Sequence, residues 1–164
     1  YDTRILELAV LKGFFGAISD EAVTYVNAPQ LAQQHGVSVR DVSSSSSSDY
    51  VNLLTLRGGG HTISGTLAGP KAAQRIVNID DTPFDVPPVD NMVVIHNDDR
   101  PGVIGTVGTL LGNAGVNISD MDVSRVNGAD TAVMLIAPSA PVPADVLDQL
   151  RSAPGILQVT SLST

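Results

Sequence analysis

The chain has 164 residues, of which 43% are hydrophobic and 16% are charged, a composition typical of a folded protein with one medium or two small domains. Its net charge of −8 argues against a nucleic-acid-binding surface, which would need a basic stripe. The absence of cysteine excludes disulfides and thiolate metal sites, and we expect no metal site. Because there is no signal peptide and no apolar run of about 18 residues, we expect a cytoplasmic protein without a membrane contact.

Mixed helical and strand-like patterns over residues 1–89 predict a small α+β domain. In chain order, apolar and turn residues predict helices over 8–18, 21–26 and 29–34, a strand over 37–40, a hairpin over 50–67, and a short helix leading into a strand over 71–79. Pro83, Pro87 and Pro88 predict a linker that ends this region. Because the chain starts at Tyr1 inside a helical pattern and without an initiator Met, we expect this domain to be N-terminally incomplete.

Six consecutive serines occupy residues 43–48. Phosphorylation or anion binding is one interpretation of such a run, and a flexible surface loop is the other. Polar low-complexity runs are usually loops, so we favour the loop.

Residues 90–164 show a cleaner pattern that predicts a second domain. Strands are expected over 92–97, 116–126, 131–137 and 156–162, helices over 103–114 and 143–151, and a hairpin turn at Asn127-Gly128. The order βαββαβ is that of a ferredoxin-like fold, in which two helices cover one face of an antiparallel sheet. The whole chain is therefore predicted to be α+β, with a domain boundary near residue 89.

The segment HNDDRPGVIG at 96–105 joins the first strand of the second domain to its first helix. Pro101 suits the first turn of a helix, and Gly102 allows a close approach to the backbone. The free N–H groups of that turn and the positive end of the helix dipole favour a small anion such as a carboxylate. Asn97 and Asp99 alternate along the same turn, so both can point towards that site. A carboxylate-binding helix end beside an aspartate suits a zwitterionic amino acid.

Three motifs of the second domain resemble those of ACT regulatory domains: DRPGVIG at 99–105, GTLLGNAGVNIS at 108–119 and PGILQV at 154–159. Four earlier segments resemble the intervening domain of long-form D-3-phosphoglycerate dehydrogenases: ELAVLKGFF at 7–15, VTYVNAP at 23–29, ISGTLAG at 63–69 and RIVNID at 75–80. The resemblance covers nearly the whole chain. It implies an intervening domain at 1–89 followed by an ACT domain at 90–164.

The resemblance further implies the regulatory half of an NAD-dependent oxidoreductase of serine biosynthesis. The family's catalytic and NAD-binding domains have no counterpart here, because no strand–GxGxxG–helix pattern is present and Gly58-Gly59-Gly60 lies in the expected hairpin. No catalytic residue is therefore carried over, and no cofactor is expected in this chain. The chain alone should be inactive.

The resemblance to ACT domains of such dehydrogenases implies that L-serine binds between two side-by-side copies and that the domain mediates homo-oligomerisation. Carried over residue by residue, the contacts fall on Asn97 and Asp99 of one copy and on Asn117 of the partner subunit. The ammonium would pair with Asp99. The carboxylate would lie on the backbone N–H groups of Gly102, Val103 and Ile104.

Each of these side chains also has a structural interpretation. Asp99 can cap the helix that follows, Asn117 can be a turn residue before its strand, and Asn97 can be a solvated strand end. The corresponding alternative function is a structural oligomerisation module that binds no ligand. An independent enzyme is disfavoured, because no grouping of His, Asp and Ser suggests a nucleophile with its base.

The family also suggests an anion site in the intervening domain, for which Arg75 and Lys71 are the candidate cations. The alternative is that both are solvated surface residues. The following stretch, 80–90, contains four Asp and no Lys or Arg, which weakens the prediction of an anion site.

Overall fold

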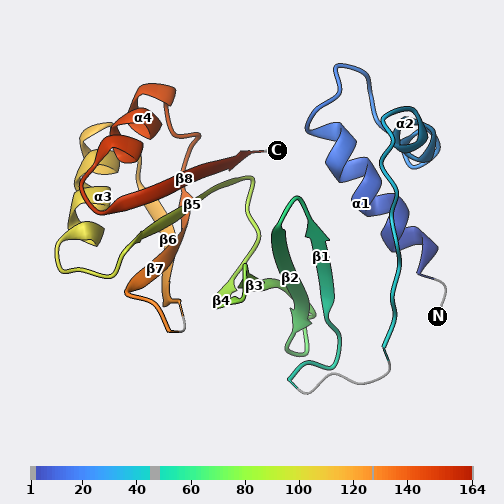
Figure 1. Ribbon diagram of the computed structural model, residues 1–164, viewed down its shortest axis with the longest axis horizontal. Coiled ribbons are helices and arrows are strands. Elements are labelled where there is room, and N and C mark those ends of the chain that lie inside the picture. The colour runs from blue at the N-terminus through green and yellow to red at the C-terminus, as the bar shows by residue number, and fades with distance from the viewer. Residues whose placement is uncertain (1–2, 45–48, 127, 164) are drawn as a thin grey trace. The chain divides into compact units, whose positions relative to one another are not determined.

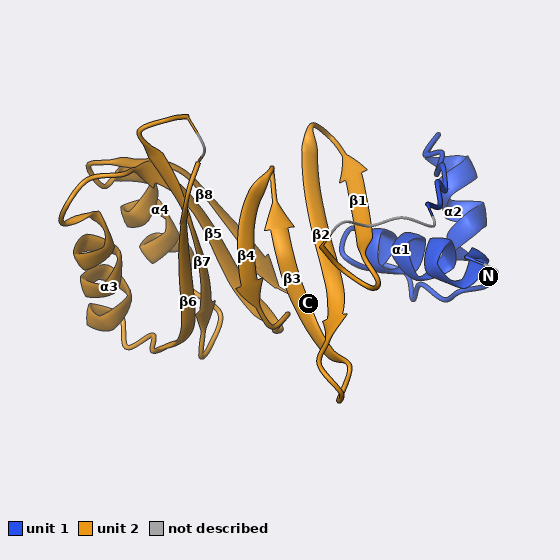
Figure 2. Cartoon of the chain, turned by 90° about the horizontal axis from the view of Figure 1, so that it is seen from below, with its two compact units in different colours: residues 1–46 blue, residues 47–164 orange. Residues whose placement is uncertain are grey.

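The computed structural model describes residues 3–44, 49–126 and 128–163, and the chain divides into two compact units, residues 1–46 and 47–164 (Figures 1 and 2). Residues 45–48 of the serine run, and Asn127 of the expected hairpin turn, lie outside the described residues. The elements are, in chain order, α1 (Arg4–Gly16), α2 (Ala28–Gln34), β1 (Leu54–Gly58), β2 (His61–Ala68), β3 (Ala73–Ile79), β4 (Thr82–Val86), β5 (Asn91–Asp98), α3 (Val103–Asn113), β6 (Ile118–Arg125), β7 (Thr131–Pro138), α4 (Ala144–Ser152) and β8 (Ile156–Ser163).

The first unit is built on two helices, α1 and α2, which pack through a small apolar core. The buried residues of that core are Leu11, Phe15, Ala28 and Ala32. Pro29 lies in the first turn of α2, where backbone N–H groups have no partner within the helix, so its missing N–H costs no hydrogen bond. The helices predicted over 8–18 and 29–34 are therefore confirmed, although α1 begins earlier than predicted.

Two other elements predicted for this unit are wrong. In place of a helix over 21–26, Asn27 Oδ1 accepts a hydrogen bond from the Thr24 N–H at 2.7 Å and closes a turn. Such bonds between side chain and backbone compete with helical ones. The strand predicted over 37–40 does not form, since these four described residues have no regular secondary structure. Alternating residues alone do not make a strand, because its backbone groups also need a neighbouring strand.

The second unit contains two antiparallel four-stranded sheets, with strand orders β1-β2-β3-β4 and β6-β7-β5-β8. We refer to them as the first and the second sheet. Both α3 and α4 lie on one face of the second sheet (Figure 1). The second sheet and its helices therefore have the predicted ferredoxin-like βαββαβ arrangement, and the α+β fold class is confirmed.

The central strands of the second sheet, β5 and β7, are buried on both faces. Alternate residues point to opposite faces. The residues that face the helices are Val93, Ile95, Met134 and Ile136. The residues that face the first sheet are Met92, Val94, Val133 and Leu135, which pack against Ile76, Ile79, Phe84 and Val86. This burial on two sides explains why both strands are continuous apolar runs in the sequence.

The first sheet confirms one prediction and corrects two. The expected hairpin is present, because β1 and β2 pair with each other antiparallel. The short helix expected before β3 is wrong, since the segment 69–72 is a turn. The expected linker contains β4 instead. Pro83 is tolerated in β4 because this strand is at the edge of the first sheet, where a missing N–H need not break the ladder.

The first sheet and the second sheet share the apolar core described above, which places residues on both sides of position 89 in one compact unit. The compact units are defined by contacts within the chain, whereas the predicted domains are defined by resemblance to protein families. The division into domains at 1–89 and 90–164 therefore remains a proposal.

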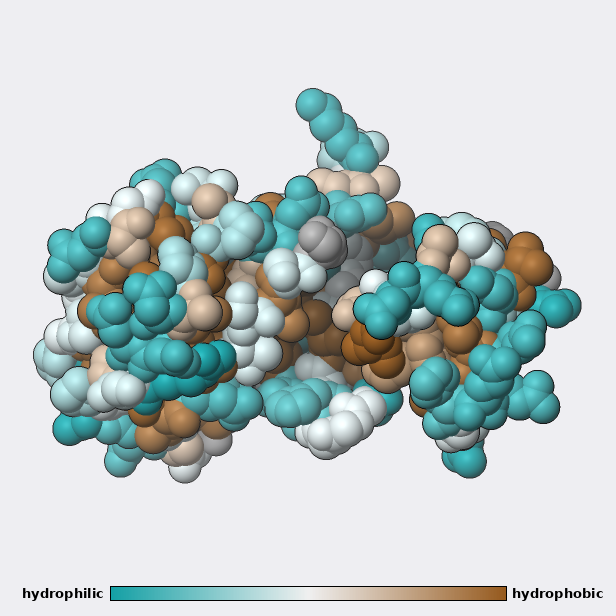
Figure 3. Space-filling view, turned by 90° about the horizontal axis from the view of Figure 1, so that it is seen from above, coloured by the Kyte–Doolittle hydropathy of each residue, from teal (hydrophilic) through white to brown (hydrophobic). Residues whose placement is uncertain are grey.

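At the surface of the second unit, polar residues interrupt the apolar ones over the end that carries α3 and α4 (Figure 3). The apolar side chains of α3 and α4 that are buried, Val103, Val107, Leu111, Val146 and Leu150, are those that pack on the second sheet. Among the described helices, none is long and apolar enough to cross a membrane.

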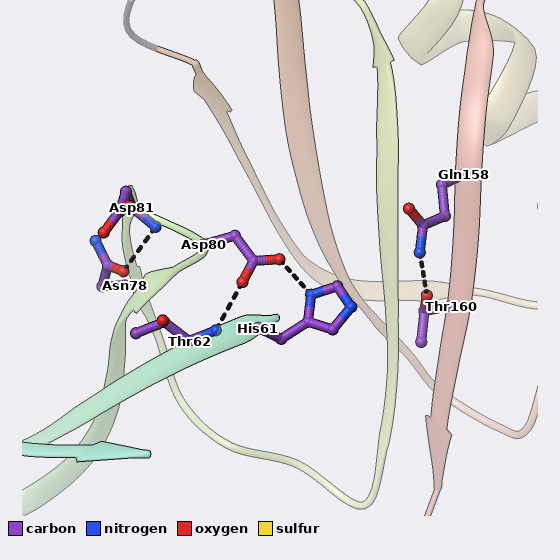
Figure 4. Close-up of polar contacts among 7 residues, drawn as sticks. All are labelled: His61, Thr62, Asn78, Asp80, Asp81, Gln158 and Thr160. Atoms are coloured by element: carbon purple, nitrogen blue, oxygen red, sulfur yellow. Dashed lines mark hydrogen bonds and ion pairs between the residues drawn. The ribbon is translucent and has the colours of Figure 1, made fainter. Parts of the chain in front are cut away.

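The turn between β3 and β4 has an unusual backbone (Figure 4). Asp80 and Asp81 are its two loop residues, between the paired Ile79 and Thr82. Both aspartates have a positive φ, 47° and 61°, as the central residues of a type I′ hairpin turn do. The Asp81 N–H donates to Asn78 Oδ1 at 3.1 Å, which helps to hold this conformation.

The carboxylate of Asp80 ties this turn to the start of β2. It accepts a hydrogen bond from the Thr62 N–H at 2.7 Å and lies 2.8 Å from His61 Nδ1 (Figure 4). Burial alone would raise the pKa of Asp80. The hydrogen bonds from Thr62 and His61, together with the charges of His61 and His96, outweigh that effect and hold the pKa of Asp80 below its ordinary value.

We expect Asp80→Asn to lower the free energy of unfolding by about 1–2 kcal/mol at pH 7, because the Thr62 and His61 contacts lose a charged partner. The pKa of Asp80 is lower in the folded chain than in the unfolded one, so this stabilisation is present above the unfolded pKa and is lost as the pH falls through the folded pKa. Urea denaturation of both proteins should therefore show a difference that shrinks below about pH 4.

Asp81→Asn is the matched control, because it makes the same change at the neighbouring positive-φ residue. Within the described part of the chain, the Asp81 carboxylate has no hydrogen bond, so the control should stay within about 0.5 kcal/mol of the parent. An equal loss in both variants would contradict a specific role for the Asp80 carboxylate.

Candidate functional site

The candidate site is the segment from Asn97 to Gly102, which comprises the end of β5 and the turn that leads into α3. Two other segments of the second unit anchor its backbone. The Asp98 N–H donates to the Gly155 carbonyl at 2.8 Å, just before β8, and the Asp99 N–H donates to the Asp130 carbonyl at 3.0 Å, just before β7. The position of the turn therefore depends on residues far away in the sequence.

The start of α3 offers free backbone donors. Gly102, the residue before the helix, has a φ of +95°, and no side chain caps the helix. Within the described residues, the N–H groups of Gly102 and Ile104 have no acceptor, and the Val103 N–H reaches only the Arg100 carbonyl at 3.5 Å. These are the groups predicted to hold a carboxylate. The alternative that Asp99 caps this helix is wrong.

Asn97 lies inside the molecule and not at a solvated strand end, so that alternative is also wrong. Its residue is 3% exposed, and it follows Val93 and Ile95 on the helix-facing side of β5. Its Nδ2 donates to the Asp98 carbonyl at 2.7 Å, but its Oδ1 is buried without a partner among the described residues. An unpaired buried oxygen costs about 1–3 kcal/mol, so Asn97 Oδ1 is ready to accept a hydrogen bond from a donor.

Asp99 already has a cationic partner. Its carboxylate forms an ion pair with Nε of Arg125, the last residue of β6. The side chain of Asp99 is 29% exposed and that of Arg125 is 81% exposed. The neighbouring Arg100 pairs with Asp98 instead, which makes Arg100 a salt-bridging residue of the turn.

Asn117 is remote from the other predicted residues of the same chain. It follows the C-terminal end of α3, and the 11 residues of that helix span about 16 Å. Its side chain is exposed, and its carbonyl accepts a hydrogen bond from the Ser139 N–H at 2.8 Å. The structure therefore brings Asn97, Asp99 and the start of α3 together and leaves Asn117 apart.

The two cations predicted for an anion site differ in their surroundings. Arg75 Nε donates to Asp85 Oδ1 and one of its terminal nitrogens to the Asp85 carbonyl, both at 2.6 Å. This hydrogen bond raises the pKa of Arg75 and lowers that of Asp85. Lys71 lies exposed in the turn before β3. The anion site stays a prediction, and an anion at Arg75 would have to compete with Asp85.

Two residues of the site were missed by reasoning from the sequence. Arg125 could have been found from the charges, since residues 90–164 contain eight Asp but only three Arg and no Lys, so each arginine is a candidate partner for an aspartate. Gly155 belongs to the PGILQV motif, but no role in the site was predicted for it. Its φ is +85°, and a Cβ there would lie 3.0 Å from Cγ2 of Val103, so any other residue would be strained and tightly packed against the start of α3.

No metal site is evident in the residues that the structure describes, since no three His, Asp or Glu side chains gather there as a metal ion would need. The chemistry of the turn is that of binding. It combines a carboxylate, free N–H groups and an unpaired amide oxygen, and it contains no nucleophile with a base.

Comparisons with known proteins match both parts of the chain. Residues 91–155 match the ACT domain, and residues 1–80 match the D-3-phosphoglycerate dehydrogenase intervening domain. The chain is similar to D-3-phosphoglycerate dehydrogenases. That of Mycobacterium tuberculosis is 38% identical over 157 residues, 93% of this chain and 30% of the relative. That of Mycobacterium leprae is 37% identical over 169 residues, 99% of this chain and 32% of the relative.

A more distant relative shows the same partial coverage. The D-3-phosphoglycerate dehydrogenase of Synechocystis is 34% identical over 159 residues, which make up 94% of this chain and 28% of the relative. The chain thus spans about 30% of the length of these relatives.

We expect Gly155→Ala to lower the free energy of unfolding by about 2–3 kcal/mol, because the new methyl group combines a positive φ with a collision against Val103. Gly115→Ala is the control. Its φ is +72°, but nothing lies within 4 Å of a Cβ at that position, so only the backbone cost of about 1 kcal/mol applies. Thermal or urea denaturation of the two variants measures the difference. Equal losses would contradict a tight contact between Gly155 and the start of α3.

Proposed function

Because this chain corresponds to the non-catalytic, C-terminal part of D-3-phosphoglycerate dehydrogenases, we propose that it is the regulatory region of such an enzyme and that it binds L-serine where two ACT domains meet. In this proposal the enzyme oxidises 3-phosphoglycerate with NAD through domains that this chain does not contain. Serine, the end product of that biosynthesis, then acts as the effector.

One observation carries the proposal: the turn before α3 presents complementary groups for both charges of an amino acid. The free N–H groups of Gly102 and Ile104 suit the carboxylate, and the Asp99 carboxylate suits the ammonium. The buried and unpaired Asn97 Oδ1 is an acceptor that a serine hydroxyl can satisfy. A ligand with a donor at that position would therefore bind better than one without it.

The arrangement of β6 supports a site shared by two copies. In the described part of the chain, β6 forms a strand ladder with β7 alone, and β4 contacts it through the bond from the Asp85 N–H to Asp122 Oδ2, so the backbone groups of its other edge can pair with a second strand. If two β6 edges pair antiparallel about a two-fold axis, the start of one strand lies beside the end of the other. Asn117 precedes the start of β6, and Arg125, the ion-pair partner of Asp99, ends it. Such pairing would bring Asn117 of the partner subunit towards Asp99.

Binding at this place would regulate the enzyme through the arrangement of its subunits. A ligand shifts an equilibrium between two arrangements only by as much as it binds one better than the other. A ligand that contacts both subunits favours the arrangement in which they are adjacent.

The alternative is a structural module that oligomerises without a ligand. One observation favours it: Arg125 already neutralises Asp99, so the turn is electrostatically satisfied by its own chain.

We expect calorimetric titration of the chain with L-serine to give heat of binding. Titration with D-serine or glycine should give less heat or none. Asp99→Asn removes a charge-assisted bond worth about 1.5–3 kcal/mol, so the dissociation constant should rise about tenfold to a hundredfold. Asn117→Ala should also weaken binding, because it removes a contact from the partner subunit. Asp148→Asn is the control, since it removes one negative charge from α4, where Asp148 pairs with Arg151.

Sedimentation velocity with and without L-serine separates the two functions. No heat at millimolar L-serine from a chain that still sediments as a dimer contradicts serine sensing and supports the structural module. Equal binding by the parent and Asp99→Asn contradicts the assigned site.

A further inference from the structure

The residue proposed to receive the ammonium of the ligand is occupied by a cation of its own chain. Arg125 Nε pairs with the Asp99 carboxylate. The two partners are held by the same hairpin, because Arg125 pairs in register with Ala132 of β7 and the Asp99 N–H donates to the Asp130 carbonyl. A guanidinium and a ligand ammonium would therefore compete for one carboxylate.

The exposures of the two side chains show which one can leave. The Arg125 side chain is 81% exposed and stays hydrated when it moves away. The Asp99 side chain is only 29% exposed, so its carboxylate is less hydrated and is still stabilised by a cationic partner. Exposed ion pairs of this kind are weak, so the exchange costs little. The other two arginines of residues 90–164 have their own partners, since Arg100 pairs with Asp98 and Arg151 with Asp148.

We propose that Arg125 is an internal competitor of the effector: it neutralises Asp99 in the empty site and is displaced by the ammonium of the bound amino acid. The proposal rests on the proposed function. Arg125 thereby sets the affinity of the site without contacting the ligand. It makes the site selective for ligands that bring a cation, because a ligand without an ammonium leaves the pair closed.

A direct role for Arg125 would have the opposite sign. If its guanidinium bound the carboxylate of the amino acid, then removing it would weaken binding. In an internal competitor, removing the guanidinium frees Asp99 and strengthens binding. The two roles are therefore distinguished by the direction of one change in affinity.

The test compares the chain with Arg125→Gln and Arg151→Gln by calorimetric titration with L-serine. Arg151→Gln is the matched control, because it removes an arginine from an ion pair on α4 and changes the net charge equally. We expect Arg125→Gln to lower the dissociation constant about two- to fivefold and Arg151→Gln to leave it unchanged. Arg125→Gln combined with Asp99→Asn should show no gain over Asp99→Asn alone, because the gain acts through Asp99. Thermal denaturation verifies that each variant is folded.

Equal or weaker binding by Arg125→Gln, with binding by the parent intact, overturns the internal competitor and leaves the proposed function standing. Binding by Arg125→Gln with none by the parent supports the competitor in its strongest form. If neither binds L-serine at millimolar concentration, both the proposed function and the competitor fail. L-Glycerate, in which a hydroxyl replaces the ammonium, should gain nothing from Arg125→Gln, and an equal gain for both ligands overturns the mechanism.

Discussion

Burial of β5 and β7 on both faces is the constraint on which the rest of the second unit depends. Ile95, Met134 and Ile136 are fully buried, and each such side chain stabilises the fold by about 1.5–3 kcal/mol. Because both faces are apolar, alternation of polar and apolar residues cannot fix the register of these strands. Backbone bonds also hold the end of β5 in place, since the Asp98 N–H donates to the Gly155 carbonyl before β8 and the Asp99 N–H donates to the Asp130 carbonyl before β7. That end of β5 belongs to the candidate site.

The candidate site thus has a buried floor and a partly exposed rim. Asn97 belongs to the floor, since it is buried among apolar neighbours and one of its two polar atoms is already used. Asp99 and Arg125 belong to the rim, where side chains are partly in water and an ion pair can open at low cost. In our proposal the buried acceptor selects a ligand by shape and hydrogen bonding, and the partly exposed ion pair sets how tightly the ligand is held. This division is why we assign recognition to Asn97 and the helix start and assign competition to Arg125.

In the first sheet, by contrast, Arg75 and Asp85 neutralise each other. Arg75 is bonded to Asp85 through both a side-chain and a backbone oxygen, and the Asp85 N–H donates to Asp122 Oδ2 at 3.2 Å. These contacts tie β3, β4 and β6 together. The guanidinium that the family resemblance offers to an anion therefore has a structural partner in this chain, and an incoming anion would meet a surface that already carries acidic groups.

The features that depend on residues close together in the chain could be predicted from the sequence. The order βαββαβ, the start of α3 at Val103 and the hairpin of β1 and β2 follow from periodicity and turn residues, which act over a few positions. Pro101, which was expected in the first turn of that helix, lies in the turn before it. Asn97 and Asp99 could be predicted as site residues in the same way, because they lie within a few positions of the start of α3.

Contacts between residues that are distant in the sequence became visible only in the folded chain. Arg125 reaches Asp99, Gly155 packs against Val103, and the segment expected to be a linker becomes β4 because β3 lies beside it. The strand expected over 37–40 does not form within the described residues, since it finds no such neighbour. Local patterns cannot specify these outcomes, because the free energy of a contact between distant residues depends on the whole chain that brings them together.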